Sequence, residues 1–142
     1  MLVRLLYASR AVQPHTQDLL DSILAQSHAH NPANGLTGIL CFSGDIFMQV
    51  LEGGRAEVSA LYSRISADTR HHGVELLHFE EISERRFANW TMGQVNLAKV
   101  NPGTLLKYSE KPELNPFVVS GKASMALLEE LIATAAIVGR VG

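Results

Sequence analysis

Apolar and polar positions along the first part of the chain follow two alternating periods. Residues 2–8 form an apolar run of strand length, in which Tyr7 shares one face with two aliphatic side chains. From Thr16, a suitable N-cap residue, apolar pairs recur at helical spacing until residues 31–35, rich in asparagine, proline and glycine, break the pattern. The pattern predicts a strand, then a helix, then a turn.

The next hydrophobic pattern predicts a hairpin and a second helix. Two apolar runs, residues 36–43 and 46–52, are joined by Gly44–Asp45, a dipeptide that suits a tight turn with a positive φ at its first central residue. Gly53–Gly54 closes the second run. Apolar residues then recur at helical spacing over residues 58–68, so we expect a second helix directly after the hairpin.

Two further strands complete the predicted sheet. Residues 74–82 and 90–97 have strand patterns, separated by the polar stretch 83–89. In the second of these strands, Trp90 and Met92 fall on one face. The predicted order is βαββαββ, which is typical of an α+β, ferredoxin-like sheet with two helices on one face and one extra strand.

Residues 98–142 are expected to form a helical extension of the core at residues 1–97, and not an independent domain. Asn101–Pro102 can begin a short helix, and residues 122–138 show an amphipathic helical pattern. The core strands are apolar on both faces. We therefore expect the C-terminal helices to cover the sheet face opposite the first two helices, or to meet a partner chain.

Composition narrows the range of partners. The 142 residues include 12 Lys and Arg against 14 Asp and Glu, so no basic excess favours nucleic acid. Cys41 is the only cysteine, which excludes an intrachain disulfide, favours a reducing compartment and predicts packing as a small hydrophobe. No targeting segment and no apolar run of membrane-spanning length is found, so we expect a cytoplasmic protein without a membrane partner.

Gln49 fits a simple hydrophobic core least well, because apolar neighbours surround it on both faces of a predicted strand. A buried amide without hydrogen bonds costs about 1–3 kcal/mol. Tyr7 is likewise a single polar group on an inward-looking strand face. The two side chains could share one ligand, or they could form a structural hydrogen bond in a filled core, and the residue pattern alone favours the second reading.

Asn31 and residues 68–72 are further candidates for ligand contacts. Asn31 ends the first predicted helix, where its carboxamide can pair with an imide or nucleobase edge, or serve as a helix cap. The following Pro32 disfavours the α-helical conformation at Asn31, which restricts where its side chain can point. Residues 68–72 place an acid, a cation and two imidazoles at a helix exit, which suits contacts to hydroxyls or a phosphate, although a solvated loop is the ordinary alternative.

The sequence lacks the motifs of common catalytic and metal sites. It contains no Gly-rich phosphate loop, no Gly-x-Ser-x-Gly elbow, no His-Glu-x-x-His and no carboxylate pair at a telling spacing. His71, His72 and His78 lack the supporting pattern of a metal site. We therefore predict neither an enzyme nor a metalloprotein.

Several short motifs occur in a fixed order over residues 2–97. They are Leu6-Tyr7-Ala8-Ser9, Ser27-x-x-x-Asn31, Gly35-Leu-Thr-Gly-Ile-Leu40, Phe47-x-Gln-x-Leu-Glu-Gly53, Asp68-x-Arg-His71 and Asn89-Trp-x-Met92. Together they resemble the BLUF family of flavin photoreceptors. The remaining length resembles short, single-domain members of the PixD type.

The resemblance implies a blue-light photoreceptor that binds a flavin noncovalently between the two helices: FAD, with FMN or riboflavin as alternatives. It implies that light drives electron and proton transfer from Tyr7 to the flavin and leaves the hydrogen bonds of Gln49 rearranged. Asn31 would bind the pyrimidine edge. The signal would pass to a separate protein effector or to an interface between copies of the chain, and the apolar stripe of the C-terminal helix favours a homo-oligomer.

The resemblance also assigns the other flavin contacts. Arg70 and His71 would contact the flavin or its ribityl chain, Asp68 would support them, and Arg64 would assist. His30 stands where many members carry a second asparagine, and we count it among the flavin contacts. This departure affects the details of binding but leaves the cofactor assignment unchanged.

Trp90 and Met92 would relay the switch through the last core strand. Gly93, where a larger residue is common in the family, and Pro32 also depart from the family pattern and bear on signalling kinetics.

Two alternatives stay open. One is a small acylphosphatase-like hydrolase, for which Ser9–Arg10–Ala11 is a poor phosphate loop, and the other is a regulatory module that binds a colourless metabolite.

Overall fold

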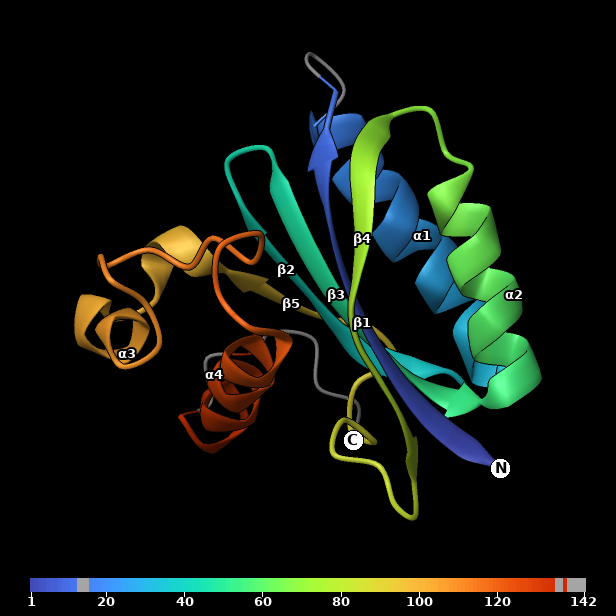
Figure 1. Cartoon of the computed structure of the whole chain (residues 1–142). Helices are drawn as coiled ribbons and strands as arrows, with labels where there is room; N and C mark the ends of the chain where they lie inside the picture. The colour runs from blue at the N-terminus through green and yellow to red at the C-terminus, as the bar shows by residue number, and fades with distance from the viewer. Residues whose placement is uncertain (13–15, 135–136, 138–142) are drawn as a thin grey trace.

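The computed structural model describes residues 1–12, 16–134 and 137, and these form one five-stranded sheet with helices on both faces. The strands are β1 (Leu2–Ala11), β2 (Thr37–Ser43), β3 (Ile46–Gly54), β4 (His71–Ile82) and β5 (Gly93–Asn96). The helices are α1 (Thr16–Asn34), α2 (Arg55–Ser66), the 3-10 helix η1 (Leu97–Lys99), α3 (Pro102–Leu106) and α4 (Gly121–Ala133). Figure 1 shows α1 and α2 together on one side of the sheet and α4 on the other.

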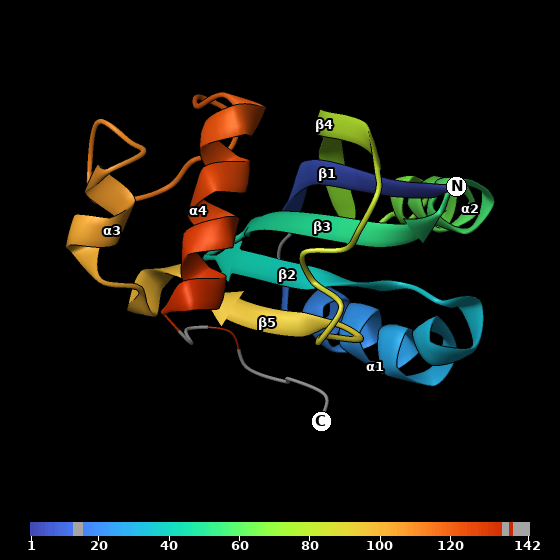
Figure 2. The ribbon, with the colours of Figure 1, turned by 90° about the horizontal axis from the view of Figure 1, so that it is seen from below.

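The strands lie in the order β4-β1-β3-β2-β5 (Figure 2). β1 is antiparallel to β3 and to β4, β2 is antiparallel to β3, and β5 is parallel to β2. This arrangement confirms the predicted ferredoxin-like α+β fold with one extra strand. The β2–β3 turn has the predicted positive φ, 58° at Gly44, which glycine adopts without a steric penalty.

The sheet face that carries α1 and α2, here the α1/α2 face, holds one half of the core. Val3, Leu5 and Tyr7 point to this side from β1 and pack in the same cluster as Leu19 of α1 and Val58 of α2. Each of the five is nearly or fully buried. The period-two pattern of residues 2–8 therefore gave the correct face for Tyr7.

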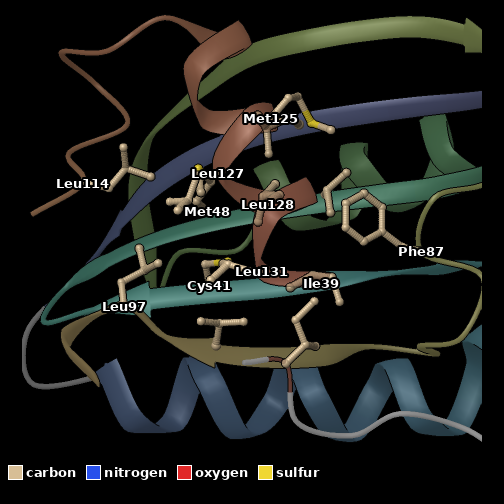
Figure 3. Packing of buried hydrophobic residues seen from close by; sticks show 14 of the residues in the cluster. Ile39, Cys41, Met48, Phe87, Leu97, Leu114, Met125, Leu127, Leu128 and Leu131 are labelled. Carbon is tan, nitrogen blue, oxygen red and sulfur yellow. The ribbon is translucent and has the colours of Figure 1, made fainter. Parts of the chain in front are cut away.

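The opposite side of the sheet, here the α4 face, holds the other half of the core (Figure 3). Leu127 and Leu128 of α4 are completely buried in the cluster that contains Ile39 and Cys41 of β2. Burial raises the pKa of the Cys41 thiol to about 12, so the group packs as a neutral hydrophobe, as predicted. The prediction that C-terminal helices cover this face is confirmed for α4; the predicted continuation at 135–136 and 138 lies outside the described residues.

The prediction that the first helix stops at Asn31 is wrong, because α1 continues through Pro32 to Asn34. The helix ends in a Schellman motif: Leu36 N–H donates to Asn31 O over 3.0 Å, and Gly35 N–H donates to Pro32 O over 3.5 Å. Gly35 has the positive φ, 68°, that this motif needs. A residue that precedes proline has a modest preference for extended backbone conformations over the helical one. The C-terminal cap and the contacts of the Asn31 side chain outweigh this preference.

The segment between β4 and β5, residues 83–92 and here the connecting segment, has no regular secondary structure. The predicted strand 90–97 is therefore too long, since β5 begins only at Gly93. The sequence pattern placed Trp90 and Met92 on one face, and this prediction is wrong. Trp90 packs in the α4-face cluster and Met92 in the α1/α2-face cluster. A period of two holds only within a regular strand, and these residues precede one.

Gly93 stands at a crowded point where the connecting segment joins β5. A Cβ atom at this position would lie 2.6 Å from the Ile137 side chain, 2.7 Å from Ile39 and 2.8 Å from Trp90. Ordinary carbon contacts begin near 3.5 Å. The missing side chain of Gly93 thus makes room for Ile137, Ile39 and Trp90 on the α4 face.

Candidate functional site

A cavity of about 520 Å³ lies between α1 and α2, a volume within the range of small-molecule sites. Its apolar walls come from both helices, as Leu19, Ile23, Leu61 and Ile65. Many of the polar residues singled out from the sequence also line it: His30, Asn31, Gln49, Arg64, Asp68, Arg70 and His71. The topology brings these residues together from two helices, two strands and a loop that are up to 41 positions apart in the chain.

Gln49 forms the floor of the cavity and is held by two buried neighbours. Tyr7 lies directly opposite it in the β1–β3 register, and the Tyr7 hydroxyl donates to Gln49 Oε1 over 2.5 Å. Gln49 Nε2 donates to Met92 Sδ over 3.3 Å. An amide has two N–H donors and two lone pairs, so Gln49 has hydrogen-bonding capacity for a group in the cavity beyond these two contacts.

The Tyr7 phenol is a neutral donor in this arrangement. Its side chain is completely buried, and burial, followed by the charges near it, raises its pKa far above the ordinary value of 10.0. The ring of Tyr62 lies 5.6 Å away, centroid to centroid, at 50°. Tyr7 therefore keeps its proton at all physiological pH values and fixes the orientation of the Gln49 amide.

Asn31 lies at the C-terminal end of α1 with only 2% of its surface exposed. Its Nδ2 donates to the Thr91 carbonyl oxygen over 3.1 Å, which ties α1 to the connecting segment. The same side chain lines the cavity. Asn31 of α1 thus binds residue 91, and Gln49 of β3 binds residue 92.

Asp68 and Arg70 form a close ion pair at the cavity. Arg70 donates to Asp68 through Nε over 3.0 Å and through Nη2 over 2.5 Å, and Nη2 also donates to Ser22 Oγ over 3.0 Å. The side-chain hydrogen bonds from Arg70 lower the pKa of Asp68 from 3.8 to about 2. The carboxylate therefore fixes the guanidinium between α1 and the start of β4.

His71 is the first residue of β4, so this strand begins three residues earlier than the pattern predicted. Its ring is nearly buried, with Nδ1 2.9 Å from Ser9 Oγ and Nε2 2.5 Å from the Ile65 carbonyl oxygen. A carbonyl oxygen can only accept, so Nε2 carries the proton in this contact. His71 links β1 to the end of α2 at the cavity wall.

Sequence reasoning missed a polar stripe on α1. Ser22, Gln26 and Asn34 line the cavity together with His30. These positions follow one another at intervals of four, which places them on one face of a helix. The signal was present in the sequence, but it is inconspicuous in a helix that is polar on most of its surface.

Trp90 and Met92, predicted to relay a signal, lie outside the lining of the cavity. Met92 is completely buried behind Gln49, to which it is hydrogen-bonded. Trp90 is 5% exposed, and its Nε1 has no hydrogen-bond partner among the described residues. The two side chains lie on opposite sides of the sheet, and only Thr91 separates the two residues in the chain.

Features of other functional classes are missing from the described part of the chain. There, no three His, Cys, Asp or Glu side chains are grouped so as to hold a metal ion. None of the helices formed by residues 16–134 is both long and apolar enough to cross a membrane. Arg10, the arginine after the first predicted strand, places its guanidinium 4.6 Å from the centre of the Phe117 ring, a cation–π contact.

The arrangement suits one kind of ligand. Apolar walls on two helices can sandwich a planar aromatic ring, while the amides of Gln49 and Asn31 can pair with donors and acceptors on its edge. Arg64 and His30, which also line the cavity, are both exposed to solvent. No residue that touches the cavity needs to act as a nucleophile for this purpose.

Comparison with known sequences and structures gives a consistent picture. The profile of one family, described as sensors of blue-light using FAD (BLUF), matches residues 2–93. The chain is similar to BlsA in its photo-activated state, with a TM-score of 0.81 and 29% identity, over 93% of this chain and 95% of that one. It is also similar to BlrB, a BLUF protein in its dark state, with a TM-score of 0.77 and 33% identity, over 94% and 96% of the two chains.

Curated relatives match over a shorter stretch. Photoactivated adenylate cyclase subunit beta of Euglena gracilis is 34% identical over 92 residues, and the blue light- and temperature-regulated antirepressor BluF of Escherichia coli (strain K12) is 31% identical over 87 residues. These stretches cover 64% and 61% of this chain. They cover only 11% and 22% of the two relatives, so the chain corresponds to a small part of each.

Proposed function

The chain belongs to the BLUF family of flavin-using blue-light sensors, and we propose that light acts in it by rearranging the hydrogen bonds of Gln49, with Tyr7 as the source of an electron and a proton. A bound flavin would absorb the light and accept both the electron and the proton, which then return to Tyr7, so that only the hydrogen bonds of Gln49 differ afterwards. Tyr7 is suited to its part because a phenol can give up an electron together with its proton. Gln49 is suited to its part because an amide can exchange donor and acceptor roles without gaining charge.

One observation carries this proposal: the Gln49 amide lines the cavity and is bonded to Tyr7 and Met92 at the same time. In the present orientation Oε1 accepts from Tyr7 and Nε2 donates to Met92. Rotation or tautomerisation of the amide changes the group presented to each neighbour. The N–H···S contact to Met92 cannot survive such a change unaltered, so the connecting segment receives the signal.

We assign the other cavity residues to binding of the flavin. Asn31 would pair with the pyrimidine edge, and His71 and Arg70 would contact the ring or the ribityl chain. Arg70 can do so in a fixed position because Asp68 and Ser22 hold its guanidinium. FAD is the proposed form, with FMN and riboflavin as alternatives, and we assign Arg64 and His30 to contacts with the flavin because both line the cavity.

We propose that the rearrangement is read by a separate protein or by an interface between copies of this chain. A light-driven switch needs contacts that differ in free energy between the dark and lit states. The contacts that change first are those of Met92, and its neighbour Trp90 packs in the cluster that includes α4. We therefore place the output on the surface of the C-terminal helices.

The direct test is the absorption spectrum of the purified full chain, in the dark and after blue illumination. The proposal predicts a bound flavin and a reversible red shift of its blue absorption band that disappears in the dark. If the chain binds flavin but its spectrum does not change on illumination, the proposed light reaction is wrong and the chain binds the flavin without responding to light. A colourless chain that takes up no added flavin would refute the assignment of the cavity.

Removing the carboxylate of Asp68 should weaken flavin binding. We expect Asp68→Asn to raise the dissociation constant of FAD roughly tenfold, because Arg70 loses a charge-assisted hydrogen bond that positions it. The low pKa of Asp68 means that the ion pair is fully formed above pH 4, and its contribution to stability is lost as the pH falls towards about 2. The pH dependence of unfolding in that window should therefore weaken in the variant.

Asp21→Asn is the matched control for Asp68→Asn. Asp21 is exposed on α1, accepts a hydrogen bond from Gln17 and does not line the cavity. Titration of each apoprotein with FAD, followed by fluorescence quenching, measures the dissociation constants. Equal affinities for both variants would show that the Asp68–Arg70 pair has no part in binding.

A further inference from the structure

Glu52 is a charged residue that lies on the α4 face, away from the cavity, and is completely buried. Both of its carboxylate oxygens are occupied. Oε1 accepts from Phe87 N–H over 2.7 Å, and Oε2 accepts from Arg86 N–H over 3.0 Å and from Arg4 Nε over 2.8 Å. Arg4, itself 5% exposed, therefore neutralises a carboxylate whose other partners are two consecutive backbone amides of the connecting segment.

A buried ion pair of this kind adds little net stability, because the cost of removing both charges from water offsets their attraction. Its geometric effect is larger. Glu52 fixes residues 86 and 87 against β3, and Arg85 adds a hydrogen bond to Thr37 Oγ1 over 2.9 Å. The middle of an otherwise irregular segment is thus attached to the sheet at one defined point.

From this point, backbone hydrogen bonds and then the chain itself lead to the cavity. Phe87 O accepts from Trp90 N–H over 3.2 Å, and Trp90 O accepts from Gly38 N–H over 3.0 Å. The next two residues are Thr91 and Met92, which are bonded to the side chains of Asn31 and Gln49. Figure 2 shows the connecting segment crossing β3 and β2 on its way to β5.

β3 therefore holds the connecting segment at two points. Gln49 binds its end at Met92 on the α1/α2 face, and Glu52, three residues later in the same strand, binds its middle on the α4 face. A strand places residues three apart on opposite faces, so the two contacts are made on the two sides of one rigid element. Any change at Gln49 therefore acts on a segment that is attached to the same strand at a second point.

We propose that Glu52 is a positioning residue for the light reaction: its carboxylate fixes the connecting segment so that Met92 Sδ and Thr91 O meet Gln49 and Asn31. This rests on the proposed function of Gln49. A fixed attachment converts the rearrangement of one amide into a displacement of residues 88–92, whereas a loose segment would absorb it. Glu52 thereby sets how far the lit state differs from the dark state and how long it lasts.

The test is Glu52→Gln in the full chain loaded with FAD, with the dark recovery of the red-shifted spectrum as the readout. The amide keeps the size of the side chain. Its Nε2 is a donor, however, and the groups around it, Arg4 and the N–H groups of residues 86 and 87, are donors as well, so no hydrogen bond can form there. We expect the flavin to stay bound and recovery to accelerate roughly tenfold or more, because a hydrogen bond to a charged acceptor is lost at the fixed point. Recovery is measured well below the midpoint of thermal unfolding of each protein.

Glu80→Gln is the matched control. Glu80 pairs with the same Arg4 and with His78, and within the described residues it makes no hydrogen bond or ion pair to the connecting segment. Recovery at the wild-type rate in Glu80→Gln and faster recovery in Glu52→Gln support the proposal. Wild-type recovery in a folded, flavin-loaded Glu52→Gln variant overturns it, as does equal acceleration in the two variants.

A measurement on the wild-type chain covers the case in which Glu52→Gln does not fold. Hydrogen exchange should show the amides of Arg86 and Phe87 protected in the dark state and under illumination, because both donate to a buried carboxylate. Free exchange of both amides in the dark overturns the proposal. Absence of any light-induced shift in the wild type would instead refute the proposed function, so the two failures are distinguishable.

Discussion

Replacing Tyr7 with phenylalanine should abolish the reversible red shift while the flavin stays bound. The substitution removes the hydroxyl that donates to Gln49 Oε1 and the group that supplies the electron and proton. Tyr7 lies behind Gln49 and does not itself line the cavity, so the space for the ligand is kept. The buried amide loses one partner, and we expect a loss of stability of about 1–3 kcal/mol. Difference spectra before and after blue illumination measure the effect.

Tyr62→Phe is the control for Tyr7→Phe. It removes the same hydroxyl from a neighbouring ring that packs on Tyr7, whereas the tyrosine hydroxyl bonded to Gln49 is that of Tyr7. This variant should retain the shift. A normal photocycle in Tyr7→Phe, or loss of the photocycle in both variants, would contradict the assigned role of Tyr7.

Truncation of Leu128 should have the largest effect on stability. Leu128 is completely buried between α4 and the sheet, and Leu→Ala at such a position costs about 2–5 kcal/mol through lost burial and the cavity that remains. We propose that residues 98–142 form one cooperative unit with the core. The Leu128→Ala variant should then unfold in a single transition at lower denaturant concentration, measured by circular dichroism and by flavin fluorescence together.

Leu106→Ala is the matched truncation at a site where 50% of the side chain is exposed. Its free energy of unfolding should change by no more than about 0.5 kcal/mol. If Leu128→Ala instead melts α4 in a separate transition and leaves the core unchanged, the C-terminal extension is an independent unit. In that case the output would not be coupled to the sheet through this helix.

Local patterns in the sequence were sufficient for most of the framework. The period of two in residues 2–8 placed Tyr7 on the α1/α2 face, and the apolar run around Gln49 marked that amide as buried. Gly44 at the hairpin and the amphipathic pattern of α4 were also read correctly. These features depend on neighbours within a few positions, which the order of residues states directly.

Other features depend on contacts between residues far apart in the chain. The helical conformation of Asn31 before Pro32 goes with a Schellman cap and with the hydrogen bond to Thr91, 60 positions away. The opposite placements of Trp90 and Met92 follow from an irregular segment, for which no period applies. Sequence periodicity therefore gave the wrong face for one of these two side chains and the wrong end for α1.

The sequence by itself determined the order of the main strands and helices, the buried face of β1, and that Tyr7 and Gln49 stand inside an apolar layer. Only the tertiary structure decided that they bond to each other, that a cavity opens beside the amide, and that Glu52 holds residues 86 and 87. The reason is physical. Side-chain alternation is a property of one segment, whereas a hydrogen bond between strands and a space between helices exist only after the whole chain has packed.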